Sequence, residues 1–374
     1  MPIRIIISGG GTGGHIYPGI AIAEELQQRD PRNKILFVGA QGKMEMERVP
    51  KAGFKIIGLP IRGLERRLAM NNFKLPFLLA ESLWKSRQII NTFRPDVVLG
   101  TGGYASAAIG WVAARKNIPL VLQEQNNYAG LTNRWLASSA KHICVAYPHM
   151  ENHFPKEKIQ LTGNPLRKNL KLQSTDQVAA YEHFGFDPNK KTILVMGGSG
   201  GARTINRALA LGIERILEAG YQVIWQTGSY YQKWVNSRIM GIQDPGLYVQ
   251  AFIEEMDKAY ACADMVVCRA GALTVSEISL LGLPAILIPS PHVADDHQTK
   301  NATGLAQAEA ALMIRDEEAA ESLTRHILAL AQDTEKQEKF RQNILKFAYP
   351  NARTDIADLL EHLATKKKPA PEFA

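Results

Sequence analysis

Two glycine-rich runs in this sequence stand where they could bind an anion or a cofactor. Residues 9–14 hold five glycines in six positions, and His15 follows at once. A second run, residues 197–201, surrounds Ser199. Glycine lets backbone N–H groups approach a ligand closely, and each run lies between an apolar segment and a helical one. Both runs therefore predict phosphate binding at a strand-to-helix turn.

The same runs also match motifs of two other enzyme classes. The first satisfies G-x-G-x-x-G, but a nicotinamide-dependent oxidoreductase also needs a carboxylate about 20 residues later, at the end of the second strand. That strand ends "FVGAQGK", without one. The second run satisfies G-x-S-x-G, which would make Ser199 a hydrolase nucleophile with His292 or His297 as its base. A hydrolase leaves the first run unexplained. No G-K-[ST] follows either run, which excludes a P-loop.

Several side chains near the first run could do acid–base chemistry. His15 could remove a proton from an acceptor hydroxyl, since histidine titrates near neutral pH, or it could cap the helix or bind phosphate. Glu124 and Asn126 follow the end of an apolar segment, and Tyr104 follows another glycine turn. Catalytic groups often lie at such strand ends.

The elements that must position these residues form two similar series. Apolar runs at 3–8, 34–39, 54–60, 95–100, 119–125 and 142–147 read as buried strands with helices between most of them, which predicts a parallel sheet covered on both faces. Residues 161–170 resemble a hinge, after which strand, glycine turn and helix recur. We predict an α/β protein with two doubly wound domains and a ligand cleft between them. The domains are residues 1–164 and 165–345, a helix at 346–364 packs back on the first, and 365–374 is a solvated tail.

Composition narrows the class of partner. The net charge of +8 favours an anionic partner, but no nucleic-acid-binding motif is present, so we expect none. Cys144, Cys262 and Cys268 form no C-x-x-C, which predicts buried thiols in a reducing compartment. No apolar stretch reaches the roughly 18 residues that span a bilayer, and the first apolar run is too short for a signal peptide, so we expect a cytosolic protein. The chain has no D-x-D, so we expect no metal ion and no cofactor.

Six motifs occur in order across both halves: "GGGTGGHIYP", "GTGGYAS", "QEQNNYAGLTNRWLA", "TGNPLR", "GGSGGARTIN" and "CRAGALTVSEISLLGLPAILIP". Together they resemble the MurG family of bacterial UDP-N-acetylglucosamine:lipid I N-acetylglucosaminyltransferases. The resemblance implies a GT-B fold and an inverting transfer of N-acetylglucosamine (GlcNAc) from UDP-GlcNAc to the muramyl 4-hydroxyl of lipid I, giving lipid II. It further implies work at the anionic cytoplasmic face of the inner membrane, alongside cell-wall and division proteins. The alternative within this fold is another lipid acceptor, such as a diacylglycerol.

The resemblance also implies roles for individual residues. Glu277 would bind the ribose hydroxyls, Ile253 would meet uracil, and Gln298 would recognise the sugar hydroxyls. His15 and Glu124 would be catalytic. The further residues implied for the donor are Thr12, Gly13, Gly14, Asn126, Arg167, Ser199, Ala272, Leu273, Thr274, Val275 and Ser276. On the acceptor side lie Gly11, Tyr104 and Asn133.

One segment, residues 71–93, predicts contact with a lipid surface. At helical spacing a stripe of apolar side chains would face the core, formed by Leu75, Leu79, Leu83 and Ile90. Phe77 and Trp84 project from the opposite side. Basic residues flank them at Arg62, Arg66, Arg67, Lys74, Lys85 and Arg87. Aromatic rings beside basic residues suit an interfacial anchor on anionic lipid, although ordinary packing against another element would also place them there.

Overall fold

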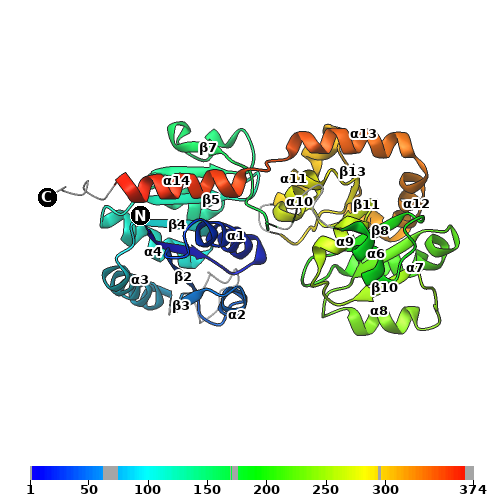
Figure 1. Cartoon of the computed structure of the whole chain (residues 1–374), viewed down its shortest axis with the longest axis horizontal. Helices are drawn as coiled ribbons and strands as arrows, with labels where there is room; N and C mark the ends of the chain where they lie inside the picture. Colours follow the sequence, from blue (N-terminus) through cyan, green and yellow to red (C-terminus); the bar gives the residue numbers. More distant parts are fainter. Residues whose placement is uncertain (1, 62–74, 169, 171–175, 294–295, 367–374) are drawn as a thin grey trace. The chain divides into compact units, whose positions relative to one another are not determined.

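The computed structural model describes residues 2–61, 75–168, 170, 176–293 and 296–366. Its contacts divide the chain into two units, drawn in Figure 1. Unit 1 comprises residues 1–167 and 349–374, and unit 2 comprises residues 168–348. The first unit therefore ends three residues after the predicted boundary and takes in the C-terminal helix as well.

The sheet of unit 1 is parallel and has seven strands in the order β3-β2-β1-β4-β5-β6-β7. The strands are β1 (Arg4–Gly9), β2 (Lys34–Ala40), β3 (Lys55–Leu59), β4 (Val97–Gly102), β5 (Leu120–Glu124), β6 (His142–Val145) and β7 (Ile159–Leu161). The first six coincide with the predicted apolar runs. β7 was not predicted, because its three residues carry no alternation long enough to recognise.

Helices cover both faces of this sheet because its strands are apolar on both sides. Alternate residues of β1 show this: Ile5 and Ile7 pack with α1 (Gly13–Arg29) and α14 (Ala352–Lys366). Ile6 faces the other core, with α3 (Leu75–Phe93), α4 (Tyr104–Arg115) and α5 (Leu131–Leu136). α2 (Glu45–Lys51) packs near β2 and β3. The polypeptide leaves β1, β4 and β5 on the same sheet edge, where the candidate residues follow.

Unit 2 repeats the architecture with six parallel strands in the order β10-β9-β8-β11-β12-β13. The strands are β8 (Thr192–Met196), β9 (Gln222–Gln226), β10 (Leu247–Gln250), β11 (Met265–Cys268), β12 (Ala285–Leu287) and β13 (Leu312–Met313). Its helices are α6 (Gln177–Phe184), α7 (Arg203–Glu218), α8 (Gln232–Ile239), α9 (Met256–Cys262), α10 (Ala272–Leu281), α11 (His297–Gln307), α12 (Asp316–Gln332) and α13 (Thr334–Ile344). α7, α12 and α13 share one core with the strands.

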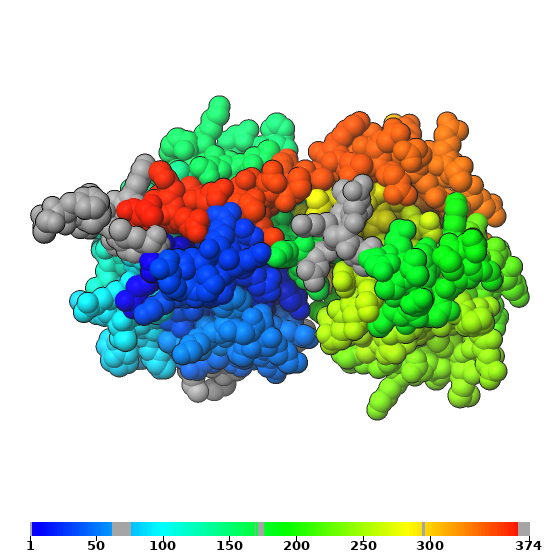
Figure 2. All heavy atoms as spheres, in the orientation of Figure 1, coloured from blue at the N-terminus to red at the C-terminus, as the bar shows by residue number. Residues whose placement is uncertain are grey.

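The C-terminal helix α14 lies beside α1 within unit 1 (Figures 1 and 2). Its apolar face buries Ile356, Ala357 and Leu360 completely. At the edge of this contact, Arg29 of α1 pairs with Asp358 at 2.5 Å and Glu361 at 2.9 Å. This packing explains why the chain crosses back to unit 1 after α13.

The buried face of helix α3 differs from the predicted core stripe. Leu79 is 45% exposed, whereas Ser82, Ser86, Ile89 and Ile90 face the core. The small serines let α3 lie close to α4, so the helix is rotated relative to the stripe that apolar residues alone would choose. Leu83 is partly buried against this core, and the Leu75 side chain lies outside the described residues.

Four of the basic residues predicted beside α3 lie outside the described residues, namely Arg62, Arg66, Arg67 and Lys74. Within the described part of the chain, no helix combines the length and the apolar character needed to cross a bilayer.

Candidate active site

The glycine run of unit 1 is shaped first by packing. A Cβ on Gly9 would lie 1.9 Å from Thr101 Oγ1, and one on Gly10 would lie 2.0 Å from Glu45 Oε1. Gly11 has a φ of +85°, which side chains rarely adopt. Three of the five glycines are therefore required by the backbone and its neighbours before any ligand is considered.

A buried carboxylate beneath this run was not predicted. Glu45 is 0% exposed, and its carboxylate accepts hydrogen bonds from Gly11 N at 3.0 Å and Ala40 N at 2.9 Å. The residue follows β2 after a short turn, so it reaches the glycine run although the strand itself ends without an acid. Gly11 N–H is thus occupied by the protein's own anion. The N–H groups of Thr12 and Gly13, at the start of α1, have no protein acceptor among the described residues and stay available for a ligand.

His15 is held in one tautomer by a buried glutamine. Gln125 donates from Nε2 to the carbonyl oxygens of Thr101 at 2.8 Å and Gln123 at 3.2 Å, so its Oε1 must be the atom that faces His15 Nδ1 at 2.9 Å. That oxygen can only accept, which assigns the imidazole proton to Nδ1. The Nε2 atom of His15 is left with its lone pair and can act as a base.

The motif "GTGGYAS" makes room for this histidine. A Cβ on Gly102, whose φ is +106°, would lie 2.7 Å from His15 Nδ1. A Cβ on Gly103, whose φ is +87°, would lie 2.5 Å from the Gly10 carbonyl oxygen. The two glycine turns that follow β1 and β4 therefore pack on each other and together set the position of the imidazole.

Glu124 holds its own loop. The side chain is 1% exposed, and its carboxylate accepts from Gly130 N at 3.0 Å, Asn133 Nδ2 at 2.9 Å and Asn126 N at 3.2 Å. Asn133 is equally buried. These contacts explain the spacing within "QEQNNYAGLTNRWLA": the carboxylate closes the turn between β5 and α5. A catalytic role for Glu124 and an acceptor-side role for Asn133 stay predictions.

Two further predicted residues of unit 1 are accessible. Tyr104 begins α4 and is 52% exposed. Arg167 is exposed, and its guanidinium lies 5.5 Å from the centre of the Tyr17 ring on α1. The structure thus brings His15, Tyr104 and Glu124 to the ends of three adjacent strands, while Arg167 lies with α1.

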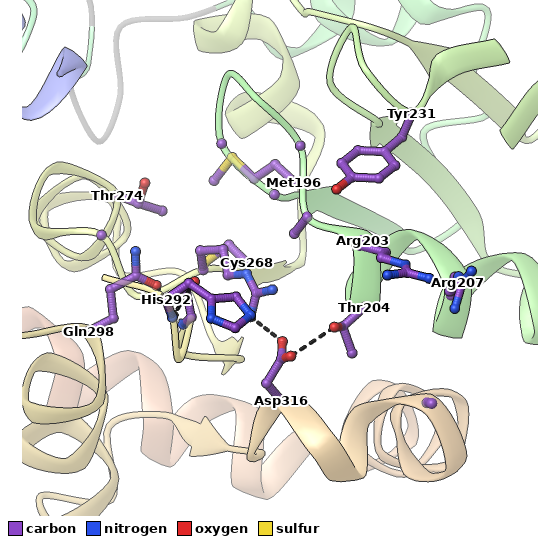
Figure 3. Close-up of a pocket in the computed structure, with 18 of the residues that line it drawn as sticks. Met196, Arg203, Thr204, Arg207, Tyr231, Cys268, Thr274, His292, Gln298 and Asp316 are labelled. Atoms are coloured by element: carbon purple, nitrogen blue, oxygen red, sulfur yellow. Dashed lines mark hydrogen bonds and ion pairs between the residues drawn. The ribbon is translucent and has the colours of Figure 1, made fainter. Parts of the chain in front are cut away.

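Unit 2 contains a cavity of about 840 Å³, called here the main cavity. Figure 3 shows side chains that line it, among them Met196, Thr274, His292 and Gln298. The second glycine run contributes Gly197, Gly198 and Gly201, and α7 contributes Arg203, Thr204 and Arg207. The walls come from the ends of β8, β11 and β12, as expected for a ligand site in an open α/β sheet.

The second glycine run is held by a second turn that packs on it. A Cβ on Gly201 would lie 2.1 Å from the Thr227 carbonyl oxygen, and one on Gly228 would lie 2.3 Å from Gly201 N. Ser199 is exposed at the tip, and its N–H has no protein acceptor among the described residues. Its hydroxyl makes no hydrogen bond to His292 there either, so the nucleophile–base pair of a hydrolase is not formed.

A glutamine links this run to the predicted uracil site. Gln226 is 3% exposed; it donates to the Gly198 carbonyl at 3.2 Å and accepts from Ile253 N at 3.0 Å. Sequence reasoning did not single it out, because a glutamine at a strand end carries no motif of its own. Ile253 itself is only 4% exposed.

The predicted ribose carboxylate lies on α10. Glu277 is half-buried and accepts a hydrogen bond from the Tyr260 hydroxyl at 2.9 Å. In the preceding turn Thr274 lines the main cavity, whereas the side chains of Ala272 and Val275 are buried. Leu273 and Ser276 are half-buried. Any contact of Ala272 and Val275 with a donor would therefore come mainly through the backbone.

Arg269 connects the segment after β12 to the start of α12 at the floor of the main cavity. Its Nη1 donates to the carbonyl oxygens of Ile288 and Pro289, both at 3.0 Å, and pairs with Asp316 at 2.5 Å. Asp316 also accepts from the Thr204 hydroxyl at 2.8 Å (Figure 3). Arg269 lies inside the motif "CRAGALTVSEISLLGLPAILIP", but its partners were not predicted because they come from distant segments of the chain.

The carbonyls held by Arg269 precede the segment of Gln298. Ser290 N donates to Gln298 Oε1 at 2.8 Å. The Gln298 amide nitrogen is consequently the group that remains for a ligand in the main cavity. Arg269 therefore acts on the predicted sugar site through the backbone of residues 288–290.

Comparison with known proteins agrees with these two halves. Residues 5–145 match the glycosyltransferase family 28 N-terminal domain, and residues 192–358 match the family's C-terminal domain. A protein of Parabacteroides distasonis is 47% identical over 97% of this chain and 99% of its own length, and one of Bacteroides thetaiotaomicron is 49% identical over 97% and 98%. The chain belongs to glycosyltransferase family 28.

Both relatives are named as UDP-N-acetylglucosamine--N-acetylmuramyl-(pentapeptide) pyrophosphoryl-undecaprenol N-acetylglucosamine transferases. A crystal structure of MurG from Acinetobacter baumannii, 28% identical, covers 96% of this glycosyltransferase and all of its own chain with a TM-score of 0.75. The predicted GT-B fold is confirmed by this likeness, and family membership excludes the nicotinamide oxidoreductase and hydrolase interpretations.

The three cysteines of this glycosyltransferase are free and buried. Burial raises the pKa of the Cys144 thiol and that of the Cys262 thiol to about 12. It also raises the pKa of Cys268, which lines the main cavity, with a smaller contribution from Glu277. Among the described residues no group of three His, Cys, Asp or Glu side chains could hold a metal ion.

Proposed function

We propose that this chain transfers GlcNAc from UDP-GlcNAc to the muramyl 4-hydroxyl of undecaprenyl-diphospho-MurNAc-pentapeptide, lipid I, and forms lipid II. The observation that carries the proposal is the identity of 47–49% over 97% of the chain to proteins named for this transfer. The two glycine runs and the cavity of unit 2 supply the anion-binding groups that a diphosphate donor needs.

In the proposed reaction the acceptor oxygen attacks the anomeric carbon and the bond from that carbon to the diphosphate oxygen breaks. UDP leaves with the electron pair, and configuration at the anomeric carbon is inverted. His15 Nε2 takes the proton of the attacking hydroxyl, because Gln125 keeps the imidazole proton on Nδ1. The negative charge that develops on UDP is stabilised by backbone N–H groups and arginine side chains, and the reaction uses no metal ion and no cofactor.

On the donor side, the open N–H of Ser199 binds the diphosphate and Glu277 accepts hydrogen bonds from the ribose hydroxyls. Gln298 donates to a sugar hydroxyl from its free amide nitrogen. Five residues of unit 1 are proposed as further donor contacts, although the main cavity lies in unit 2. They are Thr12, Gly13, Gly14, Asn126 and Arg167. Gly11 has no backbone N–H to offer the acceptor, because that N–H already donates to the Glu45 carboxylate.

A turnover assay tests the proposal. The chain is incubated with UDP-GlcNAc and a lipid I analogue, and UDP release and the disaccharide product are measured. His15→Ala should lower kcat by about 10²- to 10⁴-fold with UDP affinity unchanged, and the exposed His149→Ala on the same unit should turn over normally. Turnover with a diacylglycerol but not with lipid I would overturn the acceptor assignment.

We further propose that the enzyme docks on the anionic face of the membrane through α3. Phe77 is 78% exposed and Trp84 is 59% exposed, on the side of α3 opposite its core residues. On the adjacent helix α4, the Arg115 guanidinium lies 4.8 Å from the centre of the Trp111 ring. Rings beside guanidinium and ammonium groups are the composition that interfacial binding to anionic lipid needs.

Vesicle binding tests this surface. Burying one aromatic side chain stabilises by about 1.5–3 kcal/mol, so Phe77→Ser with Trp84→Ser should weaken binding to anionic vesicles at least about 100-fold. Affinity for UDP-GlcNAc should not change. The control is Leu211→Ser, which removes a 79% exposed apolar side chain from unit 2. Equal vesicle binding by the double variant and the wild type would contradict this docking surface.

A further inference from the structure

A second, smaller cavity lies beside the main cavity of unit 2. It measures about 430 Å³ and is lined by Arg203 and Arg207 of α7, Tyr230 and Tyr231 of the preceding loop, and Trp234 of α8. Arg203, Arg207 and Tyr231 line the main cavity as well, so the two spaces adjoin. Figure 3 draws Arg203 and Arg207 next to each other, with Tyr231 nearby. Arg203 lies in the motif "GGSGGARTIN", but no predicted donor residue lines this smaller cavity.

The two arginines carry charge that the described part of the protein does not neutralise. Neither Arg203 nor Arg207 forms an ion pair with a carboxylate there. The two acids that line the adjoining main cavity are already engaged: Asp316 pairs with Arg269 at 2.5 Å, and Glu317 lies 3.5 Å from Arg315. Both guanidinium groups are exposed to solvent and free to meet an anion.

Their position on α7 is electrostatically unfavourable without an anion. The residues are four apart, so they lie on one helix face, where like charges repel. They also occupy the first two turns, near the positive end of the helix dipole, and the first turn holds no acidic residue. A bound anion would relieve both effects. The helix is not itself the site, because the cavity and its aromatic wall define where the ligand would lie.

The aromatic wall indicates what else the ligand contains. Tyr230 is 82% exposed, and its ring meets that of Tyr231 edge to face, with centroids 4.9 Å apart. The Arg207 guanidinium lies 6.0 Å from the centre of the Trp234 ring. Tyrosine and tryptophan faces stack on planar bases, and guanidinium groups bind phosphate oxygens in pairs. The volume falls within the ~300–1,000 Å³ usual for small-molecule sites.

We propose that this smaller cavity binds a nucleoside diphosphate, with its base against Tyr230 and Trp234 and its phosphates on Arg203 and Arg207. Two adjacent guanidinium groups match the two phosphates of such a ligand better than the single charge of a peptide carboxylate. The smaller cavity adjoins the main cavity that the proposed function assigns to the donor and shares Arg203, Arg207 and Tyr231 with it, while Tyr230 and Trp234 line the smaller cavity alone. Its occupancy does not depend on which acceptor the enzyme uses. Two nucleotides have this chemistry: UDP, which the proposed reaction releases, and ADP.

Binding stoichiometry tests the proposal on the full chain without acceptor. Isothermal titration with UDP and, separately, with ADP should reveal two UDP sites per chain, or one UDP site and one ADP site. Trp234→Ala should weaken the second site about 5- to 150-fold, the effect of losing one base–aromatic stack, and leave the first site unchanged. Trp234→Phe should restore most of the affinity.

Two controls keep the outcome interpretable. Arg207→Gln should weaken the second site, whereas Arg215→Gln, an exposed arginine on the same helix outside both cavities, should not. Saturation at one nucleotide per chain, with ADP unable to bind beside UDP, would overturn the proposal even if every variant misfolded. Failure of the proposed function would instead appear as absent turnover with the lipid I analogue, whatever the stoichiometry.

Discussion

Replacing Arg269 by methionine removes the group that holds the floor of the main cavity. The guanidinium binds two backbone carbonyls at 3.0 Å and Asp316 at 2.5 Å, and the two side chains are only 14% and 20% exposed. Removing one partner of a buried ion pair typically lowers the free energy of unfolding by about 3–5 kcal/mol. Because this pair is partly exposed, we expect a loss of about 2–4 kcal/mol. Methionine preserves most of the side-chain volume, so the loss reports the polar contacts.

A double-mutant cycle isolates the pair. Arg269→Met, Asp316→Asn and the combined variant are compared by urea denaturation and by steady-state kinetics with UDP-GlcNAc. Coupling of about 1–3 kcal/mol is expected, because the second substitution removes a partner that has already lost its contact. The KM for UDP-GlcNAc should rise in Arg269→Met, since residues 288–290 and hence Gln298 lose their anchor.

The neighbouring Arg315 gives the matched control. Its side chain is 66% exposed and pairs with Glu317 and Glu318 on the surface, so Arg315→Met should change neither stability nor KM measurably. Additive effects of Arg269→Met and Asp316→Asn, within about 0.5 kcal/mol, would refute the idea that this pair organises the cavity floor.

Three other outcomes follow from the geometry. Because burial raises their pKa values far above neutrality, the thiols should not react with a disulfide reagent at pH 8 until the protein is unfolded; these are Cys144, Cys262 and Cys268. Gly103→Ala should lower thermal stability and turnover, since its Cβ would strike the first glycine run, whereas Gly53→Ala, with a φ of +85° and open space, should cost only about 1 kcal/mol. Glu45→Gln should destabilise the chain by about 1–3 kcal/mol in thermal or urea unfolding, because an amide nitrogen would replace one of the two accepting oxygens and face an N–H donor, and exposed Glu47→Gln serves as the control.

The strand pattern was predictable because parallel strands are buried on both faces. The apolar runs around Ile5, Val98 and Val195 contain few polar residues, and each coincides with a strand. Helix α3 was less predictable. Its core face includes Ser82 and Ser86, whose small size matters for the approach of α4, and apolar periodicity alone cannot recognise that.

The candidate site was predictable only where a motif marked it. His15 and Thr274 lie in quoted motifs and are found at strand ends or in the main cavity. Gln125, Gln226 and Arg269, which position other residues, act through backbone carbonyls and amides. Such contacts depend on where the chain returns in space, so no local pattern of residue types records them.

The two glycine runs differ in what each can bind. They look alike in sequence, yet the first carries Glu45 against its Gly11 N–H, while the second keeps the Ser199 N–H open and faces a cavity with arginine side chains. A buried carboxylate repels a phosphate placed near it. The first run can therefore approach a phosphate only through its helical end at Thr12 and Gly13, beside His15, whereas the second can hold a diphosphate along its tip. This asymmetry favours the second run as the site of the donor diphosphate and leaves the first to orient the acceptor hydroxyl that we propose His15 deprotonates.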